Sequence, residues 1–215
     1  MDRWATFDCY GTLIDWDGGV RAELARVFGD DRADAQLAEY HAVEPELQAS
    51  GELSYRQVLT ESMRALGAPE GEVHGLAESR PGWRAFPEVR AARDQLRRRG
   101  WNLAILSNTD DDFIAASQVQ IGLVFDEVVV AQEIGSYKPA HRHWEEFFRR
   151  TNAPREGHVH VAASLFHDVV PANELGLTSV WINRLGETSS DGARPTRELT
   201  DLVELPETLD DLVAQ

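Results

Sequence analysis

The feature that most constrains the fold is a regular alternation of strand-like and helix-like segments after Pro87. Short apolar runs, typical of buried strands, alternate there with amphipathic stretches of about ten residues, typical of helices. The expected strands are 103–106, 128–130, 159–162 and 179–182, and the expected helices are 89–99, 111–120, 141–150 and 169–175. Such an alternation predicts right-handed β-α-β units and a mostly parallel sheet.

The segment before Pro87 breaks this alternation. Residues 4–7 form a short aromatic and β-branched run, typical of a buried first strand, which ends at Asp8. The next stretch, 18–82, is rich in Ala, Leu, Glu and Arg, has apolar residues at helical spacing and contains no convincing strand. We therefore predict an α/β fold in which a doubly wound, mostly parallel sheet is interrupted by an inserted all-α helical cap.

This interpretation divides the chain into two units. Residues 1–17 and 83–215 form the predicted α/β core domain, and residues 18–82 form the helical cap inserted after the first strand. Within the core, the segment 185–197 contains Gly, Ser, Pro and charged residues and is predicted to be a loop.

Composition and charge exclude several classes of protein. Of the 215 residues, 42% are hydrophobic and 27% are charged, which is ordinary for a globular chain. The 21 Lys and Arg against 37 Asp and Glu give a net charge of -16, which disfavours nucleic-acid binding. The sequence has no apolar run of the ~18 residues that a membrane span needs, no signal-like N-terminus and a single cysteine. We expect a cytoplasmic protein that binds neither nucleic acid nor membrane, with a homodimer left open.

Polar residues follow the expected strands at the points where these strands end. They are Asp8, Ser107, Asn108, Lys138 and the segment 164–168. Ligands of open α/β sheets bind outside the carboxyl ends of the strands. An acid, a hydroxyl, an amide, a lysine and a further acid are therefore expected on one rim of the sheet.

Four segments, in this order, resemble the motifs of the haloacid dehalogenase superfamily. They are residues 7–13 (Phe-Asp-Cys-Tyr-Gly-Thr-Leu), 106–108 (Leu-Ser-Asn), 137–139 (Tyr-Lys-Pro) and 163–168 (Ala-Ser-Leu-Phe-His-Asp). Residues 181–184 (Trp-Ile-Asn-Arg) are similar to the corresponding segment of L-2-haloacid dehalogenases. The resemblance extends from Trp4 to Arg184 and implies the same fold, with a helical cap where this branch carries one.

The resemblance implies a catalytic role for Asp8. A carboxylate at a strand end can attack an electrophilic centre and form a covalent ester or acyl phosphate, the alternative being an acid that caps the following turn. Thr12 is expected to hydrogen-bond this carboxylate, and Lys138 to keep it ionised, unless that lysine is a solvated loop residue. Ser107 and Asn108 have a hydroxyl and an amide, which are suited to binding substrate oxygens. The same two residues can also cap the helix that follows, and the two roles are compatible.

Two positions depart from the phosphatases of the superfamily. Those enzymes carry an acid two residues after the nucleophile, which protonates the leaving alcohol, and an acid before the Ser-Leu pair, which binds Mg²⁺. Here these positions are Tyr10 and Ala163. Asp168 remains, but Asp8 and Asp168 together provide few oxygen ligands for a magnesium ion. We therefore expect metal-free attack on carbon with no cofactor, Mg²⁺ being required only if the protein is a phosphatase.

Two further positions depart from the L-2-haloacid dehalogenases. That branch has an arginine early in the cap for substrate and halide binding, whereas residues 38–44 here contain none. His41 and Arg56 are candidates to replace it, each with the alternative of being a surface residue. Leu165 stands where the branch has an Asn that helps to position the hydrolytic water.

Further residues of the motifs are expected to bind substrate, namely Tyr10, Ser164 and His167. For His167, local hydrogen bonding is an equal alternative. The histidine pairs at 141/143 and 158/160 lack further ligands at matched spacing, so no zinc site is expected.

Three functions are left open. The leading hypothesis is a hydrolase in which Asp8 displaces halide from a small 2-halocarboxylate, after which water activated around Lys138 and Asp168 hydrolyses the ester. One alternative is a phosphatase with atypical acid and metal positions. The other is a degenerate member that binds a small anion or a protein partner without turnover.

Overall fold

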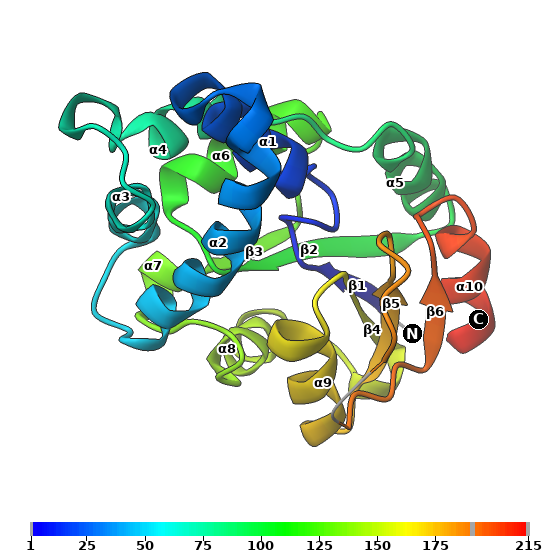
Figure 1. The fold of residues 1–215 in the computed structure, drawn as a ribbon. Helices are drawn as coiled ribbons and strands as arrows, with labels where there is room; N and C mark the ends of the chain where they lie inside the picture. Colours follow the sequence, from blue (N-terminus) through cyan, green and yellow to red (C-terminus); the bar gives the residue numbers. More distant parts are fainter. Residues whose placement is uncertain (1, 190–191, 214–215) are drawn as a thin grey trace.

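The sheet of the computed structural model, which describes residues 2–189 and 192–213, has six parallel strands (Figure 1). Their order across the sheet is β3-β2-β1-β4-β5-β6, so the first strand lies in the middle. The strands are β1 (Arg3–Phe7), β2 (Trp101–Ser107), β3 (Glu127–Val130), β4 (His158–Ala162), β5 (Thr178–Ile182) and β6 (Arg197–Leu199). This arrangement confirms the predicted doubly wound α/β fold class.

Helices cover both faces of the sheet because its strands are apolar on both sides. They are α5 (Val89–Arg98), α6 (Asp111–Ile121), α7 (Ala131–Ile134), α8 (Arg142–Thr151), α9 (Val170–Glu174) and α10 (Leu205–Leu212). Leu103 and Ile105 of β2 share one apolar cluster with residues of α5, α6 and α10, whereas Ala104 and Leu106 pack with α8 and α9 on the other face. Figure 1 shows α5 and α6 above the sheet and α8 and α9 below it.

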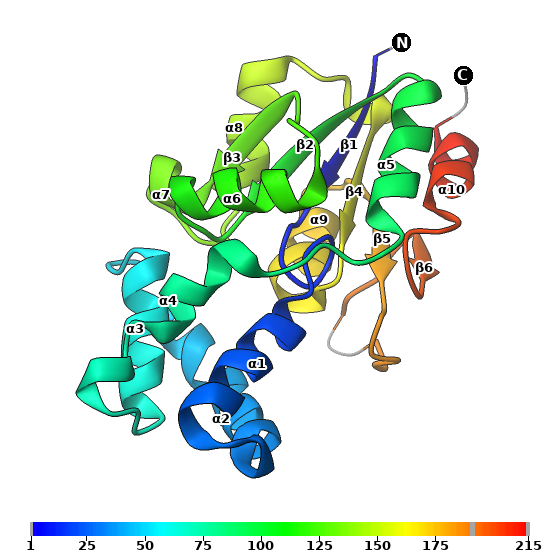
Figure 2. The same cartoon turned by 90° about the horizontal axis from the view of Figure 1, so that it is seen from above.

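A group of helices interrupts the core between β1 and α5. It consists of α1 (Trp16–Phe28), α2 (Asp30–Ala49), α3 (Tyr55–Ala65), α4 (Gly75–Ser79) and two 3₁₀ turns, Glu70–Glu72 and Arg80–Gly82. No residue of 18–82, all of which the structure describes, lies in a strand. Figure 2 shows these helices beyond the ends at which the strands finish. The inserted all-α cap is therefore present, while the division of the chain at 17/18 and 82/83 stays a prediction.

Two elements near the C-terminus were missing from the sequence prediction. β6 begins at Arg197, where the predicted loop 185–197 ends, and pairs with β5 at the sheet edge. The helix α10 follows β6 and adds Leu205 and Leu209 to the core. A strand as short as β6 cannot show the alternating pattern on which strand prediction rests. The loop residues 190–191 lie outside the described residues, and none of the described helices is long and apolar enough to cross a membrane.

Candidate active site

Asp8 is fixed at the carboxyl end of the central strand β1. Its backbone N–H donates to the carbonyl of Val161 on β4 at 3.0 Å, which extends the pairing of the two strands. The chain then turns at Gly11, whose φ of 85° lies in the left-handed region that glycine tolerates best. This turn brings the Thr12 hydroxyl to the carboxylate, where it donates to Asp8 Oδ2 at 2.9 Å. The hydrogen bond predicted between these two side chains is thus present.

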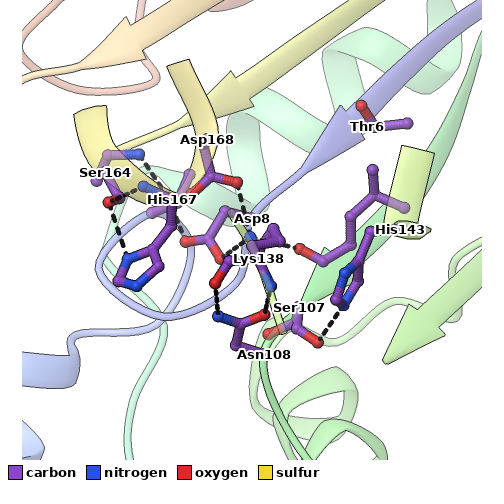
Figure 3. A network of polar contacts seen from close by, with 12 residues as sticks. Thr6, Asp8, Ser107, Asn108, Lys138, His143, Ser164, His167 and Asp168 are labelled. Carbon is purple, nitrogen blue, oxygen red and sulfur yellow. Dashed lines mark hydrogen bonds and ion pairs between the residues drawn. The ribbon is translucent and has the colours of Figure 1, made fainter. Parts of the chain in front are cut away.

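Lys138 joins two carboxylates that are far apart in the sequence (Figure 3). Its ammonium group donates to Asp8 Oδ1 at 2.9 Å and to Asp168 Oδ1 at 2.7 Å. The third N–H donates to the carbonyl oxygen of Leu106 at 2.9 Å, so every donor has an acceptor although the residue is only 2% exposed. A lysine so buried and so fully paired is not a solvated loop residue, and that alternative is wrong.

Burial and pairing separate the pKa values of the two acids. Burial raises the pKa of Asp8 above its ordinary value, and Lys138 only partly opposes this. Burial acts in the same direction on Asp168, but there Lys138 and a hydrogen bond from His160 outweigh it and hold the pKa well below its ordinary value. Burial lowers the pKa of Lys138, yet Asp168 and Asp8 outweigh it and keep that pKa raised, so the ammonium stays charged. Asp8 is therefore the more basic of the two carboxylates.

A chain of buried polar groups continues behind Asp168. His160 Nε2 lies 3.0 Å from Asp168 Oδ1. The Thr6 hydroxyl lies 2.8 Å from both His160 Nδ1 and His158 Nε2. Because a carboxylate only accepts, neutral imidazoles require that His160 donates from Nε2, Thr6 donates to His160 Nδ1, and His158 donates to Thr6. Every donor of the chain then points toward Asp168, which stabilises its ionised form in the protein interior.

Ser107 and Asn108, both expected to bind substrate oxygens, differ in the atoms they have free. Asn108 Oδ1 accepts from the Lys138 backbone N–H at 2.6 Å, and Asn108 Nδ2 donates to the Lys138 carbonyl and to Gln48 Oε1. Asn108 thus holds the backbone that carries Lys138, a role that sequence analysis did not indicate. The Ser107 hydroxyl is buried without a partner among the described residues, and its carbonyl accepts from His143.

A cavity of about 390 Å³ lies between the cap and the ends of the strands. Its core side is lined by residues predicted for the site, namely Asp8, Tyr10, Ser107, Asn108, Lys138, Ser164, His167 and Asp168. Its cap side is lined by Trp16, Asp17, His41, Glu44, Gln48 and Tyr55. Thr12 is fully buried and reaches the site through its hydrogen bond to Asp8. The structure therefore brings the predicted residues together around one cavity, with Thr12 directly behind it.

The two cap residues considered as replacements for an arginine are placed differently. His41 lines the cavity, but it is paired with Asp17 at 2.9 Å and stacked on the ring of Trp16. Arg56 pairs with Asp112 at the surface and does not line the cavity. Arg56 is therefore a surface residue, which was the alternative considered for it in the sequence analysis.

The remaining predicted substrate-binding residues are partly engaged with other protein groups. Ser164 Oγ accepts from the His167 backbone N–H at 3.1 Å and lies 3.2 Å from His167 Nδ1. Burial lowers the pKa of His167, which favours its neutral form. The Tyr10 hydroxyl lies 2.8 Å from Ser117 Oγ on α6. Local hydrogen bonding of His167 is thus present, and His167 also lines the cavity.

An arginine that sequence analysis did not single out lies behind the cavity. Arg80 is 2% exposed, and its guanidinium carbon lies 3.7 Å from the ring centroid of Tyr10 and 4.2 Å from that of Tyr55. Phe113 and Trp83 complete this aromatic cage. No guanidinium nitrogen of Arg80 has a hydrogen-bond partner within the described ranges. Tyr10 and Tyr55 both line the cavity, so the cage connects Arg80 to its wall.

Sequence analysis also missed the polar residues that α2 presents to the cavity. Glu44 and Gln48 line it and are 4% and 7% exposed. Together with Gln36 and Tyr40 they recur every four residues and form one buried face of α2. Such spacing places side chains on one side of a helix, so this polar stripe was the signal that could have identified them.

The fold and the site together define a class of protein. Its members have a parallel α/β core and a helical cap, with an acid–lysine–acid cluster beneath the cap. The chain belongs to the haloacid dehalogenase-like hydrolases, a family whose model matches residues 3–176. It is 27% identical over 215 residues to (S)-2-haloacid dehalogenase H-109 of Pseudomonas putida, covering 94% of this chain and 96% of that protein. It is also 27% identical over 188 residues to phosphoserine phosphatase of Thermus thermophilus, with 84% and 76% covered.

The fold is also shared with a solved structure. The L-2-haloacid dehalogenase from Xanthobacter autotrophicus matches with a TM-score of 0.84 at 19% identity, over 98% of this chain and 99% of that one. At that identity the match concerns the fold alone. Together the comparisons confirm the predicted superfamily and the resemblance to its dehalogenase branch.

The residues of the site do not fit the Mg²⁺ ion that phosphatases of the superfamily use. Lys138 Nζ lies between Asp8 Oδ1 and Asp168 Oδ1, at 2.9 and 2.7 Å, where it would repel a divalent cation. Ala163 has no oxygen ligand in its side chain. In the part of the chain that the structure describes, no three His, Cys, Asp or Glu side chains form a cluster suited to a metal.

Proposed function

We propose that the protein hydrolyses a small 2-halocarboxylate through a covalent ester on Asp8. The observation that carries this proposal is the Asp8 carboxylate, which is held by Lys138 and Thr12 and lines the cavity. Similarity to a 2-haloacid dehalogenase along nearly the whole chain supports the same reaction.

The reaction has two steps. An Asp8 oxygen attacks the carbon that bears the halogen, a carbon–oxygen bond forms, and the halide leaves with the electron pair of the broken carbon–halogen bond. Water then adds to the carboxyl carbon of Asp8, which releases a 2-hydroxycarboxylate, restores the carboxylate and gives up one proton. We assign the orientation of this water to Asp168 and Lys138, which are paired with each other and line the cavity beside Asp8.

The surroundings of Tyr10 favour a halide as the leaving group. An alkoxide must be protonated as it leaves, whereas a halide needs no proton. The Tyr10 hydroxyl is engaged with Ser117, and burial raises the pKa of Tyr10 above its ordinary value. The residue at the position of the phosphatase acid is therefore a poor proton donor.

Phosphate-ester hydrolysis is the second candidate, favoured by the similarity to phosphoserine phosphatase. Its charge balance is less favourable, because Lys138 is already paired with Asp8 and Asp168 and a phosphate brings up to two further negative charges. We therefore expect phosphatase activity to be weak or absent.

A parallel screen tests both candidates. Chloroacetate, the two enantiomers of 2-chloropropionate and a set of phosphate monoesters are assayed for halide or phosphate release, with EDTA or with added Mg²⁺. We expect halide release that survives EDTA. Robust Mg²⁺-dependent phosphate release by the unmodified protein, without halide release, would overturn the proposal. In Ala163→Asp, a new ligand should raise Mg²⁺ affinity, and repulsion near Asp8 should lower haloacid turnover.

The covalent step has its own test. A single turnover in ¹⁸O-water should place label in Asp8 before it reaches product, because water attacks the enzyme ester. Asp8→Asn should keep the fold and lower turnover by at least about 10³-fold, the scale of losing a covalent catalyst. Label that enters product directly, with Asp8 unlabelled, would exclude the ester.

A further inference from the structure

Glu44 of α2 is a buried acid with one oxygen committed and one oxygen free. Oε1 accepts from the Tyr55 hydroxyl at 2.8 Å and from Gln48 Nε2. Oε2 has no hydrogen bond to any described residue. It is also not one of the side-chain atoms that are both fully buried and without a partner, so part of its surface is accessible. Because Glu44 lines the same cavity as Asp8, its free oxygen is available to a molecule bound there.

Among the residues that the structure describes, the cavity has no unpaired cation for an anionic substrate. Its acidic lining residues are Asp8, Asp17, Glu44, Asp168 and Glu187, and its basic ones are Lys138, His41 and His167. Lys138 is shared by two carboxylates, and His41 is paired with Asp17. Burial lowers the pKa of His167, so that ring is neutral. An ionised Glu44 would therefore repel a substrate carboxylate without compensation.

The surroundings of Glu44 favour its protonated form. Burial raises the pKa of Glu44, and the hydrogen bonds from Tyr55 and Gln48 and the charges of Arg80 and His41 only partly oppose this. Other ionisable groups near Glu44 are Tyr40 and Tyr137 on the protein side and, across the cavity, Asp8, Lys138, Asp168, Asp17, His167 and Glu187. A substrate carboxylate brought to Oε2 would strengthen proton binding further, because binding of proton and anion is mutually favourable.

We propose that protonated Glu44 binds the substrate carboxylate by donating a hydrogen bond from Oε2, so that a proton is taken up with the anionic substrate. This inference rests on the proposed function. Since Oε1 already accepts two hydrogen bonds, Oε2 is the oxygen that carries the proton. A neutral acid thereby takes the place of a cap arginine, and the substrate class is a small carboxylate that binds best at low pH.

Steady-state kinetics with 2-chloropropionate between pH 5 and 9 tests the inference. For the unmodified protein, KM should rise about tenfold per pH unit above the titration of Glu44. Glu44→Gln keeps a neutral donor that does not titrate, so this tenfold rise in KM per pH unit should be absent from the variant. Glu44→Ala removes the donor and should raise KM about tenfold at low pH. Glu46→Gln, an exposed position on the same helix, is the matched control and should behave like the unmodified protein.

A binding measurement gives an independent readout. Calorimetric titration of Asp8→Asn with 2-chloropropionate, in buffers of different ionisation enthalpy, should show uptake of about one proton per substrate above the Glu44 titration. The double variant Asp8→Asn/Glu44→Gln should show none. The uncharged 2-chloropropionamide should bind without proton uptake in either protein.

The outcomes separate this inference from the function on which it rests. Halide release with a KM that is independent of pH and insensitive to Glu44→Gln would overturn the role of Glu44 and leave the dehalogenase intact. A Glu44→Gln variant with lower KM at every pH would show an ionised, repelling Glu44 and overturn it as well. No halide release from any haloacid by the unmodified protein would overturn the proposed function, and this inference with it.

Discussion

Lys138 and Arg80 are two buried cations that the protein accommodates in opposite ways. Each is 2% exposed. Lys138 is surrounded by oxygen, with two carboxylates and a carbonyl within 2.9 Å of its nitrogen. Arg80 is surrounded by aromatic rings, and no described residue accepts a hydrogen bond from its guanidinium group.

The difference follows from the chemistry of the two side chains. An ammonium is a compact, strongly hydrated charge, so it must exchange water for anionic or carbonyl oxygen when buried. A guanidinium is planar and more weakly hydrated, and the faces of aromatic rings can replace part of its hydration. The partners of Lys138 include the proposed nucleophile, whereas those of Arg80 join the cap residue Tyr55 to Tyr10 and Phe113 of the core. We infer that Lys138 serves the chemistry and that Arg80 holds the cap against the core.

Lys138→Met should have the largest effect. It leaves Asp8 and Asp168 buried without their cation, so we expect unfolding free energy to fall by about 3–5 kcal/mol in urea titrations. Haloacid turnover should fall by more than about 10³-fold. Adding Asp168→Asn removes one unpaired charge and should recover part of the stability without restoring turnover. Unchanged stability in the single variant would show that the cluster does not depend on its cation.

Arg80→Met should cost less, about 2 kcal/mol, because lost cation–π contacts are partly offset by relief from burying an unpaired charge. Urea unfolding measures this, and the matched change Arg80→Lys tests the role of the planar group. We expect Arg80→Lys to be no more stable than Arg80→Met, since an ammonium in the aromatic cage lacks oxygen partners. Full stability in Arg80→Lys would contradict the comparison.

The positive charge of Lys138 also acts on His143, whose ring donates a hydrogen bond to the Ser107 carbonyl. Burial, followed by the charge of Lys138, lowers the pKa of His143 to about 3. Between an unfolded value near 6.5 and pH 3, the unfolded chain binds a proton there that the folded protein does not. The contribution of His143 to the free energy of unfolding is therefore fully present above about pH 6.5. As the pH falls below this value, the contribution decreases by about 1.4 kcal/mol per pH unit.

His143→Gln isolates this contribution, because Gln can donate to the same carbonyl but does not titrate. Urea unfolding at several pH values from 4 to 7 should show that the unfolding free energy falls less steeply with decreasing pH in the variant. The difference between the two slopes should correspond to about one proton. An identical slope in both proteins would show that His143 is not the group responsible.

Arg56→Ala should have the smallest effect. Arg56 stacks on Phe113, as Arg80 does, but it is exposed and paired with Asp112. An exposed ion pair is screened by water, so we expect a loss below about 1 kcal/mol and unchanged KM for haloacid. A tenfold increase in KM would mean that this residue replaces the missing cap arginine after all.

The positions of Asp8, Ser107, Lys138 and Asp168 on one rim could be predicted from the sequence alone. Each follows an apolar run that marks a strand, and parallel strands end at the same edge of a sheet. The helical character of the cap was equally local, because apolar spacing of the kind seen at Tyr55, Val58 and Leu59 reports helix directly. Both conclusions need only neighbouring residues and the rules of chain topology.

The tertiary structure alone decided which polar groups find partners. The Asn108 amide, expected at the substrate, holds the backbone of Lys138. Glu44 meets Tyr55 from another helix, and Arg80 meets the ring of Tyr10 across the junction of cap and core. Hydrogen bonding and burial depend on contacts between segments that are distant in the chain. A periodic pattern records which side of an element is buried, but it carries no information about which group lies opposite.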